Sequence, residues 1–183
     1  MKILTVSLLS LIIISSFSGC AMVHRYGAFY GKVIDIETKE PLEGAAVLAI
    51  YYTESYGPAG AHTHYLDAQE AVTDKGGEFR IKPLTAKTFR VLHSFDPHVY
   101  FTIFNPGYGC YPWHKDVKPI FVPNGTLSAD QYVTIELPKL RTIPERLTNT
   151  MIPLSSEIPI EKYIKLKELI NQEFKNLGRA PIR

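Results

Sequence analysis

The stretch Ala46-Val47-Leu48-Ala49-Ile50-Tyr51-Tyr52 decides the fold, because it is apolar at every position. Side chains in an extended strand point alternately to opposite faces. One face then carries Val47, Ala49 and Tyr51, and the other carries Leu48, Ile50 and Tyr52. A strand that is apolar on both faces must be covered on both. We therefore expect residues 46–52 to form a strand with one layer packed on each side.

Short strand patterns with turn signals between them surround this stretch. Val133, Ile135 and Leu137 alternate with polar or aromatic neighbours over residues 132–137, which is typical of a half-buried strand. Asp74-Lys75-Gly76-Gly77 predicts a tight hairpin turn, because glycine supplies the positive φ that such a turn needs. Further strand patterns cover 30–36, 68–73, 78–82, 88–92 and 99–104, and 53–65 is expected to be a loop. Short strands at this density predict a mainly β sandwich.

A helical pattern follows the strands. Residues 141–159 hold three prolines and several Ser and Thr residues, so we expect a linker. Residues 160–178 predict an amphipathic helix, with Pro159 before its first turn and Gly178 at its C-terminal cap. Its apolar positions are Ile160, Tyr163, Ile164, Ile170, Phe174 and Leu177. We expect this helix to pack on the outer face of the sheet that contains 46–52. The alternatives are a partner-binding helix or one that lies on a membrane.

Composition narrows the classes of function. The 183 residues include 20 Lys and Arg against 18 Asp and Glu, so no general basic field favours nucleic acid as a partner. Two cysteines are too few for a disulfide scaffold or a Cys-only zinc site. No G-x-S-x-G, H-E-x-x-H, C-x-x-C or phosphate-loop pattern is present. We therefore expect neither an enzyme nor a cofactor.

The first residues have the pattern of an export signal. Met1-Lys2 is a short positive start, and the uncharged run from Ile3 to Ile14 spans only about 18 Å as a helix, against about 30 Å for a hydrocarbon core. Small residues then lead to residue 19. This order is typical of a secretory signal rather than a transmembrane helix. We interpret residues 1–19 as the signal peptide.

Phe17-Ser18-Gly19-Cys20 resembles the lipobox of bacterial lipoproteins, although Leu is usual where Phe17 stands. The resemblance implies that Cys20 becomes the acylated first residue of the mature chain, carrying diacylglycerol and a further acyl chain such as palmitate. Residues 20–28 would then be a tether. Ala21, rather than Asp, is similar to the pattern of outer-membrane sorting. The alternative is an ordinary signal-peptidase site before residue 22. Cys110 is then either a free thiol or the partner of Cys20 in a disulfide.

A second resemblance lies in residues spaced along the expected strands. The order is Gly31-x-Val33, Thr38, Pro41-Leu42, Gly44-Ala45 and Val47, then Thr73-Asp74-x-x-Gly77-x-Phe79 and Pro106-Gly107-Tyr108. This order resembles the carboxypeptidase regulatory-like domain. The resemblance implies a transthyretin-like (prealbumin-like) Greek-key β-sandwich over residues 29–140. It also implies a non-catalytic module that supports another domain or binds at the cell envelope.

Two groups of side chains are candidates for ligand binding. Tyr108, Tyr111 and Trp113 lie among Pro and Gly residues, where flat rings could stack on sugars or peptides, or fold back to close the end of the sandwich. His62 and His64 could ligate zinc or copper, or be solvated loop histidines. We expect no committed metal site.

Together these patterns predict a lipoprotein of the cell envelope that acts as a structural or interaction module. Acylated Cys20 would anchor it in a lipid bilayer, in the outer membrane facing the periplasm. Its expected partners are this bilayer and either envelope proteins or peptidoglycan. The alternative function is a periplasmic ligand-binding protein that uses the loop aromatics for glycans or the loop histidines for metal.

Overall fold

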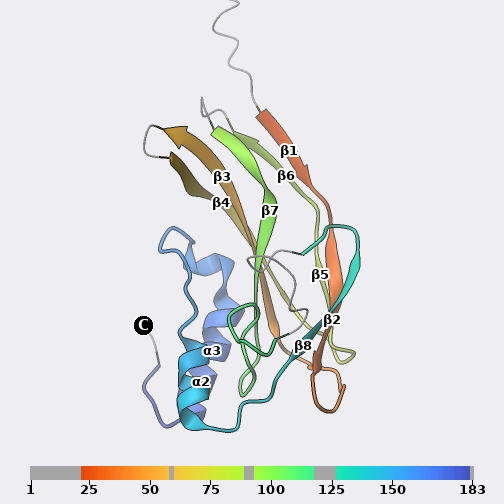
Figure 1. The fold of residues 1–183 in the computed structure, drawn as a ribbon, viewed down its shortest axis with the longest axis vertical. Helices are drawn as coiled ribbons and strands as arrows, with labels where there is room; N and C mark the ends of the chain where they lie inside the picture. The colour runs from red at the N-terminus through yellow and green to blue at the C-terminus, as the bar shows by residue number, and fades with distance from the viewer. Residues whose placement is uncertain (1–21, 58–59, 89–92, 118–126, 182–183) are drawn as a thin grey trace, which may run out of the picture.

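Both faces of the strand that contains residues 46–52 are covered, as the sequence predicts. The computed structural model describes residues 22–57, 60–88, 93–117 and 127–181, and is mainly β (Figure 1). Strand β3 (Ala46–Gly57) pairs antiparallel with β4 (Gly60–Val72) on one side and β7 (His93–Phe104) on the other. Its inward side chains belong to the main core, and its outward side chains belong to a second core under the helices.

The other layer consists of two shorter sheets that continue one another. Strand β2 (Phe29–Asp35) lies between β5 (Glu78–Ile81), which is antiparallel to it, and β8 (Tyr132–Leu137), which is parallel. Strands β1 (Met22–Tyr26) and β6 (Leu84–Thr88) form an antiparallel pair. The same register runs through both pairings, from Tyr26 opposite Leu84 to Phe29 opposite Ile81. Chain segments 22–35 and 78–88 therefore form one long ribbon, interrupted at residues 27–28 and 82–83.

The main core fills the space between the two layers. Aromatic rings meet there edge to face, with ring centroids 5.0 Å apart for Phe29 and Phe101 and 4.8 Å apart for Tyr26 and Tyr51. Gly31 of β2 allows the parallel strand β8 to approach, since a Cβ at this position would overlap the carbonyl oxygen of Val133. The layers thus make a sandwich-like arrangement with aromatic packing at its centre.

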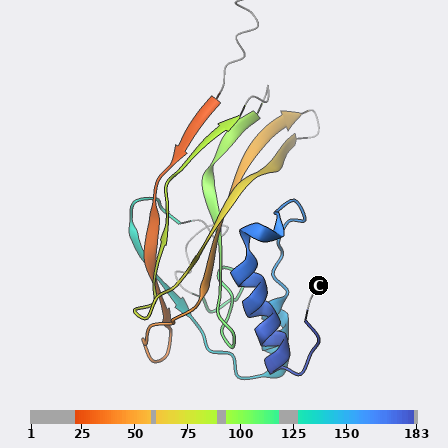
Figure 2. The ribbon, with the colours of Figure 1, turned by 180° about the vertical axis from the view of Figure 1, so that it is seen from behind.

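Helices cover the outer face of β3 and β4, which confirms the packing expected from the sequence. They are α2 (Ile143–Thr150), the 3₁₀ turn η2 (Ile160–Lys162) and α3 (Ile164–Asn176) (Figures 1 and 2). Leu166 and Ile170 of α3 pack with Ile158 against the outward side chains of β3. Gly178 ends the helix in the left-handed conformation at φ 68°, and the N–H of Arg179 donates to the carbonyl of Phe174 at 2.8 Å.

The start of α3 is capped by the sheet rather than by its own sequence. The helix has no capping side chain at its N-terminus, where Tyr163 stands. Instead, the carboxylate of Glu70 on β4 accepts the backbone N–H groups of Lys165 at 2.9 Å and Leu166 at 2.7 Å. These groups have no acceptor within the helix, and the negative charge favours the positive end of the helix dipole. Glu70 therefore fixes the start of α3 at a defined position along β4.

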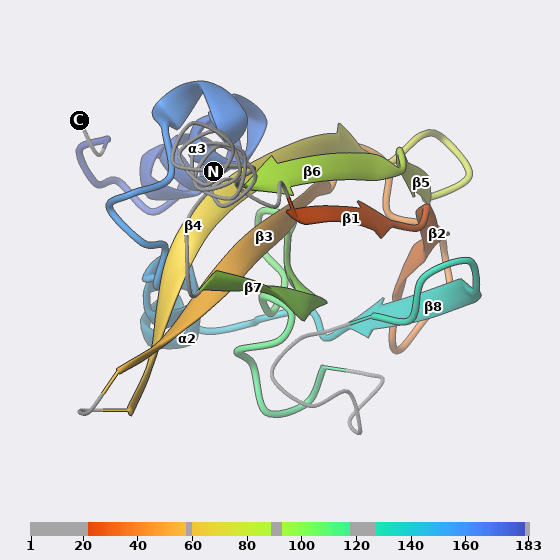
Figure 3. The same cartoon turned by 90° about the horizontal axis from the view of Figure 1, so that it is seen from above.

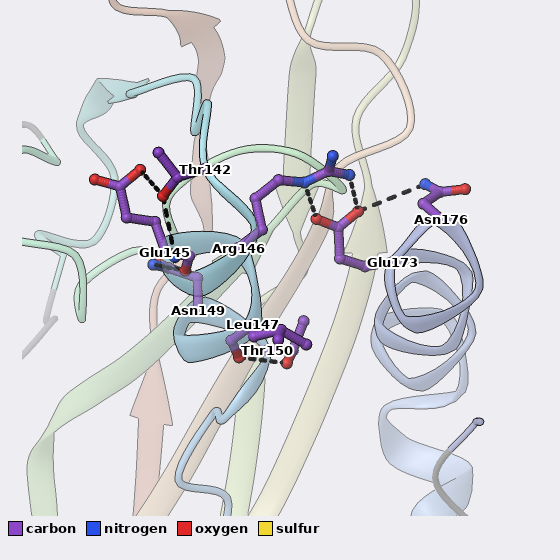
Figure 4. Close-up of polar contacts among 8 residues, drawn as sticks. All are labelled: Thr142, Glu145, Arg146, Leu147, Asn149, Thr150, Glu173 and Asn176. Carbon is purple, nitrogen blue, oxygen red and sulfur yellow. Dashed lines mark hydrogen bonds and ion pairs between the residues drawn. The ribbon is translucent and has the colours of Figure 1, made fainter. Parts of the chain in front are cut away.

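A buried ion pair joins the two helices. Arg146 of α2 donates from Nε and Nη2 to the two carboxylate oxygens of Glu173 on α3, at 2.6 and 2.8 Å (Figure 4). Glu173 is 1% exposed. This pairing raises the pKa of Arg146. Because a guanidinium and a carboxylate match in a bidentate geometry, the pair sets the relative position of α2 and α3.

Two segments that were expected to lack regular structure contain strands. The predicted loop 53–65 forms the outer arms of the β3–β4 hairpin, with Gly57 opposite Gly60 near its tip. Gly57, Gly60 and Ala61 lie near that tip, while the arms pair through their backbones irrespective of side-chain polarity. The predicted tether 20–28 includes β1, whose Tyr26 is buried in the main core.

The expected linker 141–159 contains helix α2. Thr142 caps it: its Oγ1 accepts the N–H of Glu145 at 3.4 Å and donates to the Glu145 carboxylate at 2.8 Å. The Thr-x-x-Glu spacing of a capping box, with Pro144 in the first turn, is visible in the sequence and is typical of a helix start. The prolines of 141–159 therefore start and flank a helix instead of preventing one.

The buried side of the C-terminal helix also differs from the predicted stripe. Ile160 and Ile164 are exposed, whereas Leu166 and Glu173 are buried. The buried face shifts because Tyr163, between the end of η2 at Lys162 and the start of α3 at Ile164, has the non-helical angles φ −142° and ψ 39°. Burial of a charged residue such as Glu173 cannot be seen in a hydrophobic pattern, because it depends on the partner Arg146.

The predicted Asp74–Gly77 turn connects strands of two different sheets instead of two paired strands of a hairpin. The turn itself is present, with the N–H of Gly77 donating to the carbonyl of Asp74 at 2.8 Å and Gly77 at φ 74°. However, β4 before the turn pairs with β3, and β5 after it pairs with β2. A tight turn can therefore pass the chain from one sheet to the other.

Candidate functional site

Several residues of the pattern that resembles the carboxypeptidase regulatory-like domain lie at the end of the domain opposite to the start of β1. The side-chain hydroxyl of Thr73 donates to the carbonyl of Leu42 at 2.6 Å and accepts the N–H of Ala45 at 2.8 Å. The carboxylate of Asp74 accepts the N–H groups of Gly76 and Glu78 at 2.8 and 2.9 Å. Each polar group satisfies backbone groups of a turn. The contacts of these residues are therefore structural.

Asp35 organises the same end of the domain. Its carboxylate accepts the N–H groups of Glu37 at 2.7 Å and Thr38 at 3.0 Å, and the hydroxyl of Tyr108 at 3.1 Å. Burial by itself would raise the pKa of Asp35, but these hydrogen bonds to the charged form outweigh it and hold the pKa below its ordinary value. Burial, together with Asp35, raises the pKa of Tyr108. Tyr108 thus binds the turn after β2 instead of presenting its ring as a platform.

The fold places the three aromatic residues of the predicted platform in different environments. The loop after β7 turns back, and Tyr111 exchanges two backbone hydrogen bonds with Ile103, at 3.0 and 3.1 Å. Tyr111 is 1% exposed and belongs to the main core. Of these three residues, only Trp113, at 56% exposed, offers a large ring surface to solvent. Of Tyr108, Tyr111 and Trp113, the structure leaves Trp113 as the candidate for ligand contact.

Trp113 lines a pocket with two tyrosines that lie far from it in the sequence. The pocket has a volume of about 270 Å³ and lies on the outer face of the β4-β3-β7 sheet. Tyr52 of β3 and Tyr100 of β7 meet edge to face in its wall, with ring centroids 5.5 Å apart. Its remaining lining is Ile50, Thr63, Phe101, Thr102 and Pro153. A second pocket of about 270 Å³ shares Trp113 and Pro153 and reaches Asn149 and Met151.

A buried carboxylate holds one wall of the first pocket. Asp96 is 1% exposed, and it accepts the hydroxyl of Tyr100 at 3.0 Å and the Nδ1 of His98 at 2.8 Å. Burial and this carboxylate raise the pKa of Tyr100 to about 12. Burial and, next, the charge of Glu157 raise the pKa of Tyr52. Both phenols are therefore neutral at physiological pH, and the Tyr100 ring is fixed in place.

The register of β3, β4 and β7 is what brings this pocket together. Tyr52 is on the outward face that the alternation over 46–52 assigns to it. The sequence does not indicate that Trp113 or Tyr100 lies beside it, because these contacts depend on how the strands pair and how the loop returns. Tyr52 and Tyr100 are thus site residues that the sequence analysis missed.

His62 and His64 lie on strand β4, in the outer arm of the hairpin rather than in a loop. They are two residues apart and therefore share one face of the strand. The Nε2 of His64 lies 2.9 Å from the hydroxyl of Ser55 on β3. Among the described residues, no three His, Cys, Asp or Glu side chains are grouped so that they could hold a metal ion.

The chain has two cysteines, Cys20 and Cys110. Cys20 lies outside the described residues. Cys110 is a buried free thiol; its backbone N–H donates to the side-chain oxygen of Asn149 at 2.9 Å, and burial raises its pKa. A thiol with a raised pKa is a poor nucleophile. Cys110 thus serves as a small packing residue between the loop and α2.

Comparisons of the chain with models of protein families, with curated proteins and with solved structures gave no match. None of the helices in the described ranges has the length and apolar character needed to cross a bilayer.

Proposed function

We propose that this protein is a lipid-anchored protein of the cell envelope and that its β-domain is a non-catalytic structural or interaction module. The observation that carries the proposal is the position of Cys20. It follows the residues with the pattern of an export signal and lies two residues before Met22, the first residue of the first strand. An acylated residue at this position would begin the mature chain where the folded domain begins. The bilayer is the outer membrane, with the domain facing the periplasm.

We also propose that the domain belongs among the carboxypeptidase regulatory-like domains, with the transthyretin-like Greek-key order of strands. Several neighbours within each layer are distant in sequence, such as β2 with β8 and β3 with β7, which suits a Greek-key arrangement. The parallel pairing of β2 with β8 makes use of Gly31, and the corner between the layers makes use of Gly77. Both glycines are part of the pattern that resembles this family.

The contacts of the pattern residues support a non-catalytic role. The polar residues of this pattern whose hydrogen bonds are described above are Thr73, Asp74 and Tyr108. Thr73 and Asp74 bond to backbone groups, and Tyr108 bonds to the carboxylate of Asp35, which itself accepts backbone N–H groups. A catalytic group needs access to a substrate in a cleft. These side chains instead hold turns at one end of the domain.

The test of the anchor compares the parent chain with Cys20→Ser in a two-membrane bacterium. The parent should fractionate with the membrane, and its intact mass after extraction should include acyl chains. The Cys20→Ser variant should lack that mass and leave the membrane fraction. A parent chain without added acyl mass, or a variant that stays with the membrane, would contradict the proposal.

A second candidate function is saccharide binding at the pocket of Trp113, Tyr52 and Tyr100. The observation that favours it is an exposed indole beside two neutral phenols, one of them fixed by Asp96. Flat aromatic faces pack on the C–H faces of sugar rings, and hydroxyl groups provide hydrogen bonds at the edges. Peptidoglycan fragments are the saccharides that an envelope protein would meet.

Trp113 is the only tryptophan in the chain, so fluorescence excited selectively at tryptophan reports on the surroundings of Trp113. Titration with soluble peptidoglycan fragments should change the fluorescence of the parent in a saturable way. Tyr100→Ala should weaken this response, whereas Tyr132→Ala, which removes an exposed tyrosine outside the pocket, should not. A parent that shows no saturable change would exclude this candidate.

A further inference from the structure

The connection between Cys20 and the folded domain is short. Strand β1 begins at Met22, and a chain of two residues extends at most about 7 Å. The strand itself cannot detach easily, because its five residues pair with β6 and its Tyr26 is buried in the main core. The hydroxyl of Tyr26 also donates to the carbonyl of Asp96 on β7 at 2.8 Å. A lipid on Cys20 would therefore hold one end of the domain close to the bilayer.

This end of the domain can be identified in the structure. The start of β1, the end of β6, the outer end of the β3–β4 hairpin and the start of β7 all reach the top of Figure 1. Figure 3 looks down onto this end and shows the hairpin extending to one side of the other strands. The turns after β2 and β4 lie at the opposite end, with α2 and α3 nearer to it. The ribbon of residues 22–35 separates the two ends by about 45 Å, at roughly 3.3 Å per residue.

The side chains of the first end suit a layer of lipid headgroups. Val23 and Arg25 are exposed on β1, and Lys87 stands opposite Val23 on β6 and is also exposed. Tyr56, at the hairpin tip, is 66% exposed, and its hydroxyl donates to the carboxylate of Glu54 at 2.7 Å. Arginine and lysine are attracted to anionic lipids, and tyrosine favours the level of the headgroups.

We propose that this end, defined by Val23, Arg25, Tyr56 and Lys87 and named the anchor end, lies against the lipid headgroups of the bilayer. The domain then stands on the membrane in one orientation instead of swinging on a flexible tether. The opposite end, with the Asp35 and Asp74 turns, is held about 45 Å away in the aqueous space. This proposal rests on the proposed acylation of Cys20, and it adds the surface that faces the membrane.

The test places a fluorescent label at one end or the other of the acylated full chain. Cys20 is blocked by acylation and Cys110 is buried, so an introduced cysteine is the site that a label reaches. Ala61→Cys puts the label at the anchor end and leaves Tyr56 in place. Lys75→Cys puts it in the exposed turn between β4 and β5 and serves as the matched control. Each labelled protein is incorporated into phosphatidylethanolamine–phosphatidylglycerol vesicles, some of which carry a nitroxide on the headgroup.

Headgroup nitroxide should remove most of the fluorescence of the label at residue 61 and almost none of that at residue 75. Equal quenching at the two positions, or stronger quenching at 75, would overturn the proposal. Flotation with the vesicles is measured first; a chain that does not float speaks against the acyl anchor instead. Arg25→Glu with Lys87→Glu should float as the parent does but show weaker quenching at residue 61. Unchanged quenching in this variant would refute headgroup contact by these cations.

Discussion

Removal of Arg146 should show how much the stability of the domain depends on pairing the buried charge of Glu173. Glu173 is almost completely buried, and Arg146 supplies both of its short hydrogen bonds. Loss of one partner of a buried pair costs about 3–5 kcal/mol, because the remaining charge stays in a poorly solvated place. The Arg146 side chain is 25% exposed, so water can enter where it stood. We therefore expect Arg146→Leu to lower the free energy of unfolding by about 3 kcal/mol, the lower end of that range.

The double variant distinguishes the cost of leaving the Glu173 carboxylate buried without a partner from the cost of removing the Arg146 side chain. Arg146→Leu with Glu173→Leu leaves no buried charge, so it should be more stable than Arg146→Leu alone. Equilibrium urea unfolding followed by circular dichroism measures both. For a domain of this size, about 3 kcal/mol corresponds to a fall in Tm of roughly 6–12 °C.

Arg141→Leu is the matched control, because it removes an arginine whose pair with Glu37 is exposed on both sides. It should change stability little. The reasoning is refuted if Arg146→Leu unfolds at the same urea concentration as Arg141→Leu. It is also refuted if the effects of Arg146→Leu and Glu173→Leu are simply additive in the double variant.

Three further predictions concern the sheet and its ends. Glu70→Ala should cost about 1 kcal/mol through loss of the cap on α3, and it should speed hydrogen exchange at the amides of the first turn. Because the pKa of Asp35 lies below its ordinary value of 3.8, its contribution is present above that pH and is lost as the pH falls further. The stability difference between the parent and Asp35→Asn should accordingly shrink in acid urea titrations below that pH. Gly31→Ala should prevent close pairing of β2 with β8 and lower Tm strongly, whereas Gly57→Ala, where a Cβ meets nothing within 4 Å, should not.

Much of the fold could be predicted because side-chain alternation is a local property. The two apolar faces of residues 46–52 predict a layer on each side, and both layers are present. The alternation over 132–137 is confirmed by burial of Ile135 and Leu137. The hairpin arms at 53–65 were missed because backbone pairing carries no side-chain pattern of its own. The helix at 143–150 was not predicted because the three prolines of 141–159 favour a linker, although Thr142 and Glu145 have the spacing of a capping box.

The candidate site was less predictable than the fold. Tyr111 and Trp113 are two residues apart in the same loop, yet one is buried and the other exposed. Their difference arises because Tyr111 pairs with Ile103 through the backbone, which turns its ring into the core. The partners of Trp113 come from β3 and β7, and no spacing in the sequence joins them.

The sequence by itself determined the layered β architecture and the C-terminal helix on the outer face of the sheet, and it predicts an export signal. Each of these depends on hydrophobic periodicity or on the order of residues within a short stretch. Only the tertiary structure decided that β1 is part of the domain, that Glu70 caps a helix from a strand and that Glu173 is buried against Arg146. These features depend on contacts between residues far apart in the chain, which form only when the strands pair in register and the helices dock.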